Sequence, residues 1–290
     1  MADTDVRAEP AGIRIARTLS FVLLGSMVIA SAAGLLVDGL YQDPEAVSSM
    51  LRGYDLVTLV IAAPVLAISL LPSLRESPRA QLLWTAMLAY GVYNYAIYLF
   101  GTAFNDVFLL HVTAFSSSVF AFGLVLANLD AAGIAARFAE RTPVRWISVV
   151  LLLLGVGLGV LWLFYSVRFA VTGDAPQETR LVTPAANLHL AYVLDLALLV
   201  PGYLVAGVLL WRRQAWGYVL GAALLGFSVV YQLNYMTALA FQAAADVPGA
   251  TAFDPQEPPI AAAALAATVV LLAGLSPKLS RRPAGSRQIG

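Results

Sequence analysis

Two carboxylates and two amides recur at one spacing within long apolar stretches of this chain. Asp55 is followed 39 residues later by Asn94, and Asp195 is followed 39 residues later by Asn234. A polar or ionisable group in hydrocarbon is costly unless it is paired or hydrated, so each of the four is a candidate functional residue. The pattern predicts that the carboxylates supply charge and that the amides orient a bound molecule through hydrogen bonds.

Further polar and aromatic residues accompany these four on the predicted helices. Tyr90, Asn94 and Tyr98 are spaced four residues apart and therefore share one helix face. Lipid offers such groups no hydrogen-bond partner, so they are expected to face the interior of a helix bundle. The predicted pocket comprises Asp55, Tyr90, Asn94, Tyr98, His111, Asp195, Tyr231, Gln232, Asn234 and Tyr235.

Structural roles are the alternative interpretation of the same residues. Asp55 could be the N-cap of the helix that follows it, because a side-chain oxygen at that position accepts a bond from the first helical turn. Asn94 and Asn234 could simply bond across the bundle, which stabilises a membrane protein by about 0.6 kcal/mol per contact. His111 could be a satisfied histidine of the core.

Several kinds of chemistry are excluded by the residues that the chain lacks. It has no cysteine and only two histidines, and no predicted helix contains the lysine that a retinal Schiff base requires. The spacings typical of a zinc site and of a glycine-rich phosphate loop are also missing from the sequence. No cofactor is therefore predicted. A haem held by His111 and His189 is the alternative, because both fall near the same predicted depth.

Composition assigns the chain to a membrane. Of its 290 residues 60% are hydrophobic and 12% are charged, whereas soluble domains carry about 25% charged residues. The net charge is zero and no basic cluster with interleaved aromatic residues is present, which argues against a nucleic-acid partner. We therefore expect an all-α polytopic membrane protein whose first partner is the lipid bilayer.

Eight apolar stretches of about 20 residues, the length that crosses a bilayer, predict eight transmembrane helices. Turn-forming pairs such as Asp43-Pro44 and Thr142-Pro143 separate them. The predicted spans lie near residues 15–37, 54–72, 82–101, 107–128, 146–167, 190–211, 216–240 and 259–276.

The basic residues favour one side of the predicted bundle. Fourteen of the 17 fall in the two tails and in alternate loops. Because Arg and Lys are retained on the cytoplasmic side, both termini are predicted to be cytoplasmic. Four tryptophans, Trp84, Trp146, Trp211 and Trp216, fall at the same helix ends, as in an interfacial belt. Sixteen arginines against one lysine suggest a bacterial protein, and hence the bacterial inner (plasma) membrane.

An internal duplication is a further prediction. A shift of 140 residues aligns Asp55, Asn94 and Asp106 with residues of the same type. Two four-helix halves would then share one orientation and be related by an axis along the membrane normal; coincidence in an apolar chain is the alternative. The implied organisation is a cytoplasmic tail, two halves and a basic cytoplasmic tail, at residues 1–13, 14–140, 145–277 and 278–290.

Two local features leave alternatives open. Ala30-Ser31-Ala32 resembles a signal-peptidase site, but the apolar stretch continues through Leu36, so the first helix is expected to be retained. Cleavage would leave seven helices. The small-residue spacing of Gly155 and Gly159 allows close helix approach, either within the chain or between the chains of an oligomer.

These features predict a non-enzymatic membrane protein with an outward-facing polar and aromatic pocket. The pocket would bind or transport a small or amphiphilic molecule. One alternative is a membrane-embedded enzyme acting on a lipid-type substrate at the outer leaflet, with Asp195 and His111 as the acid–base pair. A second alternative is a structural or assembly subunit without a ligand.

Overall fold

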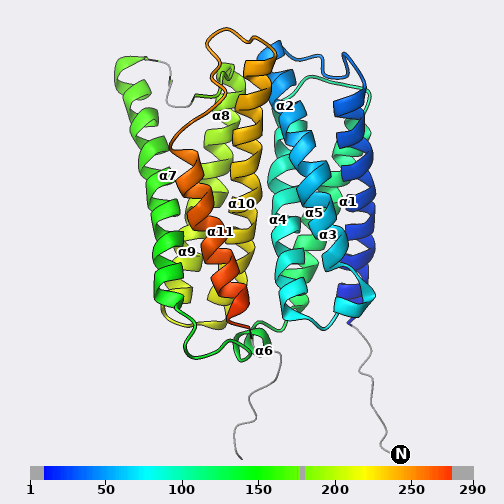
Figure 1. The fold of residues 1–290 in the computed structure, drawn as a ribbon, viewed down its shortest axis with the longest axis vertical. Helices are drawn as coiled ribbons and strands as arrows, with labels where there is room; N and C mark the ends of the chain where they lie inside the picture. The colour runs from blue at the N-terminus through cyan, green and yellow to red at the C-terminus, as the bar shows by residue number, and fades with distance from the viewer. Residues whose placement is uncertain (1–9, 175, 177–179, 276–290) are drawn as a thin grey trace, which may run out of the picture.

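The computed structural model describes residues 10–174, 176 and 180–275, which fold into a bundle of long helices (Figure 1). No β-strand occurs among these residues. The predicted tail 278–290 and most of the tail 1–13 lie outside the described residues. The helical elements are α1 Ala11–Leu36, α2 Glu45–Val57, η1 Thr58–Ala62, α3 Ala63–Ser69, η2 Pro72–Leu74, α4 Pro78–Phe100, α5 Phe108–Asn128, α6 Ala131–Ala135, α7 Val144–Thr172, α8 Ala185–Leu194, η3 Asp195–Leu199, α9 Val200–Trp211, α10 Ala215–Ala244 and α11 Glu257–Ala273.

Six helical segments are long and apolar enough to cross a membrane. They are α1, α5, α7, α10 and two rods that each join several elements. The first rod is formed by α2, η1 and α3, and the second runs from Asn187 in α8 through η3 and α9 to Trp211. The other two predicted spans, 82–101 and 259–276, correspond to α4 and α11. Tyrosines and Asn94 make α4 more polar, and α11 has only 17 residues.

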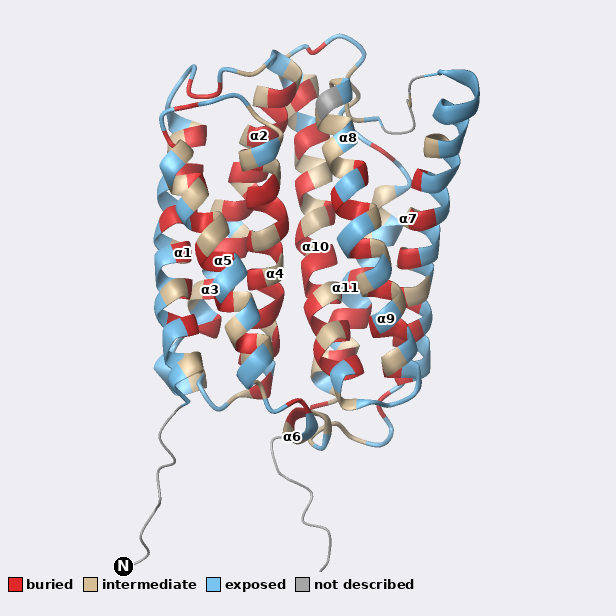
Figure 2. Ribbon diagram, turned by 180° about the vertical axis from the view of Figure 1, so that it is seen from behind, coloured by how far each residue is buried: buried red, intermediate tan, exposed pale blue. Residues whose placement is uncertain are grey.

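The outer surface of the bundle is apolar, as a lipid environment requires. Large side chains such as Phe21, Ile29, Phe120 and Val160 are each more than half exposed. Figure 2 shows buried residues on the inward sides of the helices and exposed residues on the outward sides. A soluble monomer rarely exposes so much contiguous apolar surface. The protein is therefore a multi-pass helical membrane protein.

The helices pack as two adjoining groups. In the first group α1 packs on α5, α5 on α4, and the rod formed by α2, η1 and α3 lies against both α1 and α4. In the second group α9 packs between α7 and α10, and α11 lies on α10. Because α10 also runs along α2 and α4, it joins the two groups at the centre of the molecule (Figure 1).

Two rods begin in the same way and carry an aspartate at the same place. Pro44 is the N-cap residue of α2 and Pro184 that of α8. Asp55 and Asp195 each follow ten residues after the first helical residue. The predicted helix starts near 54 and 190 were therefore too late, and the N-cap interpretation of Asp55 is wrong. At 1.5 Å per residue, both carboxylates lie about 15 Å into their helices.

A π-helical turn interrupts each of these rods just before a proline. The N–H of Ala63 bonds to the carbonyl of Thr58, and the N–H of Val200 bonds to that of Asp195. The next residue in each rod is a proline. A proline ring clashes with the carbonyl four residues earlier. The π-helical turn is wider, because its N–H groups bond to the carbonyl five residues earlier, and this widening relieves the clash. Such turns often mark functional sites.

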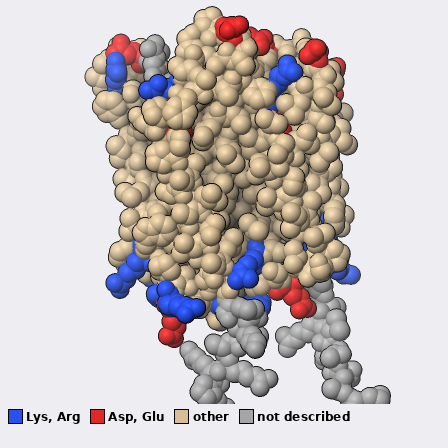
Figure 3. Space-filling view, viewed as in Figure 1, with Lys and Arg blue, Asp and Glu red and all other residues tan. Residues whose placement is uncertain are grey.

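The two ends of the bundle differ in charge. We define the terminal face by the start of α1, the end of α11 and loops 70–77, 129–143 and 212–214. We define the acidic face by loops 37–44, 101–107 and 245–256 and by the described residues of loop 173–184. Arginines gather at the terminal face and most acidic residues at the acidic face (Figure 3). Trp146, Trp211 and Trp216 are partly exposed at the terminal face. Trp84 is buried, and its indole N–H donates to the Ser20 hydroxyl at 2.8 Å, so the prediction that Trp84 belongs to an interfacial belt is wrong.

The small residues of α7 serve packing within the chain. A Cβ added at Gly155 would lie 2.9 Å from the Cβ of Tyr203 on α9, and one added at Gly159 would lie 3.1 Å from Val200. Their missing side chains allow α7 and α9 to approach closely.

Candidate functional site

Asp195 lies at the start of the η3 turn and is fully buried. Three side chains from three other helices surround its carboxylate. The hydroxyl of Tyr93 on α4 donates at 2.6 Å and the indole N–H of Trp162 on α7 donates at 2.8 Å. The hydroxyl of Tyr231 on α10 lies at 3.5 Å. A carboxylate with only donors around it is satisfied as an acceptor without an ion pair.

Asp55 forms a separate cluster in the first group of helices. The Tyr41 hydroxyl donates to its Oδ2 at 2.5 Å, and the Tyr98 hydroxyl donates to its Oδ1 at 2.9 Å. Burial, reinforced by the Asp55 charge, raises the pKa of the Tyr41 phenol well above its ordinary value, which keeps Tyr41 protonated as a donor. Gly34 on α1 leaves room for this pair, since a Cβ there would overlap the carboxylate.

A third cluster connects the two groups of helices. The Asn234 side-chain amide on α10 donates to the Asn94 oxygen on α4 at 3.1 Å. Asn234 also lies within 3.3 Å of the Tyr90 hydroxyl, which bonds to Thr58 at 2.6 Å. Two residues predicted to orient a ligand are thus in direct contact with each other.

His111 packs beside the Asp55 cluster. The centroid of its ring lies 4.6 Å from the ring centroid of Tyr98 and 6.0 Å from that of Tyr95. The residue is 1% exposed. His111 is thus a core residue, and neither of its ring nitrogens has a hydrogen-bond partner among the described residues. His111 belongs to the first group of helices and Asp195 to the second, with a different set of neighbours around each.

The second group of helices, together with α2 and α4, borders a partly open cavity of about 570 Å³. Its walls come mainly from α7, α8, α10 and α11, and its two acidic residues, Asp254 and Glu257, lie toward the acidic face. Of the ten predicted site residues, Tyr231, Gln232 and Tyr235 line it. Asp195 lies behind the wall, because its partners Tyr93 and Trp162 line the cavity. The other predicted residues belong to the Asp55 cluster, beside which His111 packs, or to the cluster of Asn94 and Asn234.

The end of the cavity nearest the acidic face is polar. Asp254, Gln256 and Glu257 line it. Arg180 pairs with Asp254 at 3.6 Å, and its backbone N–H donates to the Tyr235 hydroxyl at 3.2 Å. This end of the cavity therefore lies at the acidic face.

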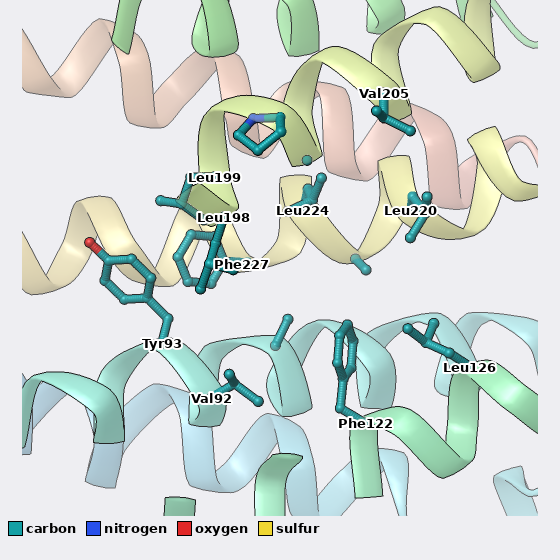
Figure 4. Close-up of a pocket in the computed structure, with 14 residues that line it drawn as sticks. Val92, Tyr93, Phe122, Leu126, Leu198, Leu199, Val205, Leu220, Leu224 and Phe227 are labelled. Atoms are coloured by element: carbon teal, nitrogen blue, oxygen red, sulfur yellow. The ribbon is translucent and has the colours of Figure 1, made fainter. Parts of the chain in front are cut away.

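A second, apolar cavity of about 420 Å³ lies between α4, α5, α9 and α10. Figure 4 shows Phe122 and Leu126 on one side and Leu220 and Leu224 on the other. Tyr93 lines both cavities, and its hydroxyl points away from the apolar one (Figure 4). Its ring thus forms part of the partition between them.

The described residues contain no group of three or more His, Asp or Glu side chains placed to hold a metal ion. The two histidines that a haem would need differ in setting. His111 is buried in the first group of helices, whereas His189 is exposed on α8.

Sequence reasoning missed several residues around the site. Trp162 carried a signal, because it lies within α7, ten residues before the end of that helix. Tyr93 lies within the same tyrosine-rich run as Asn94, but on another face of the helix. Tyr41 lies in the loop between α1 and α2, and Glu257 is the first residue of α11. Tyr41 reaches Asp55, and Glu257 reaches the cavity, only when the chain folds.

Comparison with known protein families, characterised proteins and solved structures finds no match to this chain. The fold and its apolar surface define the class: a polytopic, all-helical integral membrane protein with a polar and aromatic cavity.

Proposed function

We propose that this protein binds or transports a small or amphiphilic molecule through the cavity of its second group of helices. The observation that carries the proposal is the 570 Å³ cavity, with two acidic residues at its end nearest the acidic face and a buried carboxylate behind its wall. Ligand sites are typically concave, mostly apolar and supplied with a few placed polar groups. A volume of this size suits a small molecule or the polar end of a larger one.

The proposed topology has eight spans, with the terminal face in the cytoplasm and the cavity facing outward in a bacterial inner membrane. The arginines of the terminal face support this orientation through the retention of positive charge inside. The shared placement of Pro44 and Pro184, of the two aspartates and of the π-helical turns supports two related halves, at 14–140 and 145–277.

Native mass spectrometry of the purified protein tests the proposal. Gly157 lines the cavity, and a Cβ added there meets nothing within 4 Å. Gly157→Phe is expected to fill the cavity and to reduce the amount of any retained molecule. Gly25→Phe is the matched control, because Gly25 is equally open but lies on the outer side of α1. Equal retention by the wild type and both variants would contradict a ligand in this cavity.

Uptake measurements then separate transport from binding. Replacing the buried Asp195 by Asn removes its charge, and a transporter is expected to lose uptake of the retained molecule while its expression stays unchanged. Full uptake by Asp195→Asn would exclude the proposed role of Asp195. A wild type that neither retains nor takes up a ligand would favour a structural or assembly subunit.

A further inference from the structure

The charged residues that line the cavity are all acidic. Asp254 and Glu257 line it, Asp195 lies behind its wall, and no Lys, Arg or His belongs to the described lining residues. The nearby Arg180 pairs with Asp254 at the end nearest the acidic face. Gln232 bonds to the Glu257 carboxylate, and one oxygen of that carboxylate has no hydrogen-bond partner among the described residues. A carboxylate that is partly removed from water is stabilised by a positive charge beside it.

Aromatic rings make up much of the polar part of the wall. They are Tyr54, Tyr93, Trp162, Tyr203, Tyr231 and Tyr235. The face of an aromatic ring carries partial negative charge and attracts cations, most strongly where water is excluded. Rings and carboxylates thus favour the same kind of ligand.

The remainder of the wall is aliphatic. On α7 it is formed by Leu153, Leu154 and Leu158, and on α11 by Ile260 and Ala263. This part offers neither charge nor hydrogen bonds, so it suits the apolar body of a ligand. An inorganic cation would need several oxygen ligands, and the described residues hold no group of three carboxylates or histidines.

We propose that the cavity binds an organic cation with an apolar body, of the alkylammonium class. Its charged group would lie among the tyrosines near Glu257 and Asp195, and its apolar part would lie against α7 and α11. This inference rests on the proposed binding function and specifies the chemistry of its ligand. A neutral analogue would lack the charge attraction to Glu257 and to the ring faces, and an anion would be repelled by both carboxylates.

Isothermal titration calorimetry on the whole protein in neutral maltoside micelles tests the charge preference. The probes are hexyltrimethylammonium, hexyl glucoside and hexyl sulfate, at constant ionic strength and with protein-free micelles as the blank. The cation is expected to bind at least about tenfold more tightly than the neutral probe. Binding of the neutral or the anionic probe as tightly as the cation would overturn the inference while leaving a binding cavity. Failure of all three probes to bind would count against the proposed function as well.

Variants locate the preference. Glu257→Gln and Asp195→Asn are each expected to weaken cation binding by about tenfold and to leave the neutral probe unaffected. Asp38→Asn is the matched control, because Asp38 is an exposed acid of the acidic face outside the cavity. If Asp195→Asn fails to fold, Glu257→Gln and the probe series decide. Unchanged cation affinity in Glu257→Gln would overturn the assignment to this cavity.

A lipid head group and a free amine share this chemistry. Dihexanoylphosphatidylcholine carries the same trimethylammonium group as hexyltrimethylammonium beside a phosphate and two short chains. Tighter binding of the phospholipid would assign the cation to a lipid head group. Weaker binding would assign it to a free organic cation.

Discussion

The hydroxyl of Tyr93 on α4 donates a 2.6 Å hydrogen bond to the carboxylate of Asp195 on the η3 turn. Tyr93 belongs to the first group of helices and Asp195 to the second. A side chain of one group therefore completes the polar site of the other. Since the Tyr93 ring also borders both cavities, any ligand that crossed from one cavity to the other would have to displace it.

Removal of the Tyr93 hydroxyl is expected to destabilise the protein. Tyr93→Phe keeps the ring but deprives the buried Asp195 of a donor, which should lower the free energy of unfolding by about 1–2 kcal/mol. Thermal unfolding in detergent measures the change. Tyr165→Phe, on the partly exposed side of α7, is the control. Equal melting temperatures for the two variants would show that the bond contributes nothing to stability.

A methyl group at Gly34 is expected to disturb the Asp55 cluster. The added Cβ of Gly34→Ala would overlap the Asp55 carboxylate and approach the Tyr41 hydroxyl. Overpacking of this kind costs about 1–3 kcal/mol. Gly25→Ala lies on the same helix with nothing within 4 Å and should leave the melting temperature unchanged or raise it, since alanine favours a helix. The expectation fails if both variants melt alike.

The amide pair between the two helix groups is expected to show measurable coupling. Asn234 donates to Asn94 at 3.1 Å, and such contacts in a membrane protein are worth about 0.6 kcal/mol on average. A double-mutant cycle with Asn94→Ala and Asn234→Ala isolates the contribution of the pair from the rest of each side chain. Strict additivity of the two single substitutions would mean that the contact does not join the groups.

The proposed orientation can be tested by labelling, because the chain has no cysteine of its own. Asp38 on the acidic face and Glu140 on the terminal face are both exposed. In intact cells a membrane-impermeant maleimide should label Asp38→Cys but not Glu140→Cys. After lysis both should react. The reverse pattern would place both termini outside.

The sequence by itself determined the class and the polar positions of this protein. Apolar stretches of membrane length predict long helices whatever their neighbours, and six of them are confirmed. Isolated Asp and Asn residues in such stretches must be buried, because lipid cannot hydrogen-bond them; Asp55, Asn94, Asp195 and Asn234 are all less than 5% exposed. These inferences depend only on local composition and the chemistry of the solvent.

Only the tertiary structure decided which of these residues meet. Asp195 is completed by Tyr93 and Trp162, which lie 102 and 33 residues away along the chain. Asn94 and Asn234, predicted from separate helices as ligand-binding groups, bond to each other. Sequence periodicity reports the face on which a residue lies, but not the rotation and pairing of helices. Those depend on close packing between segments distant in sequence, so the cavity and its acidic, aromatic wall emerge only when the bundle forms.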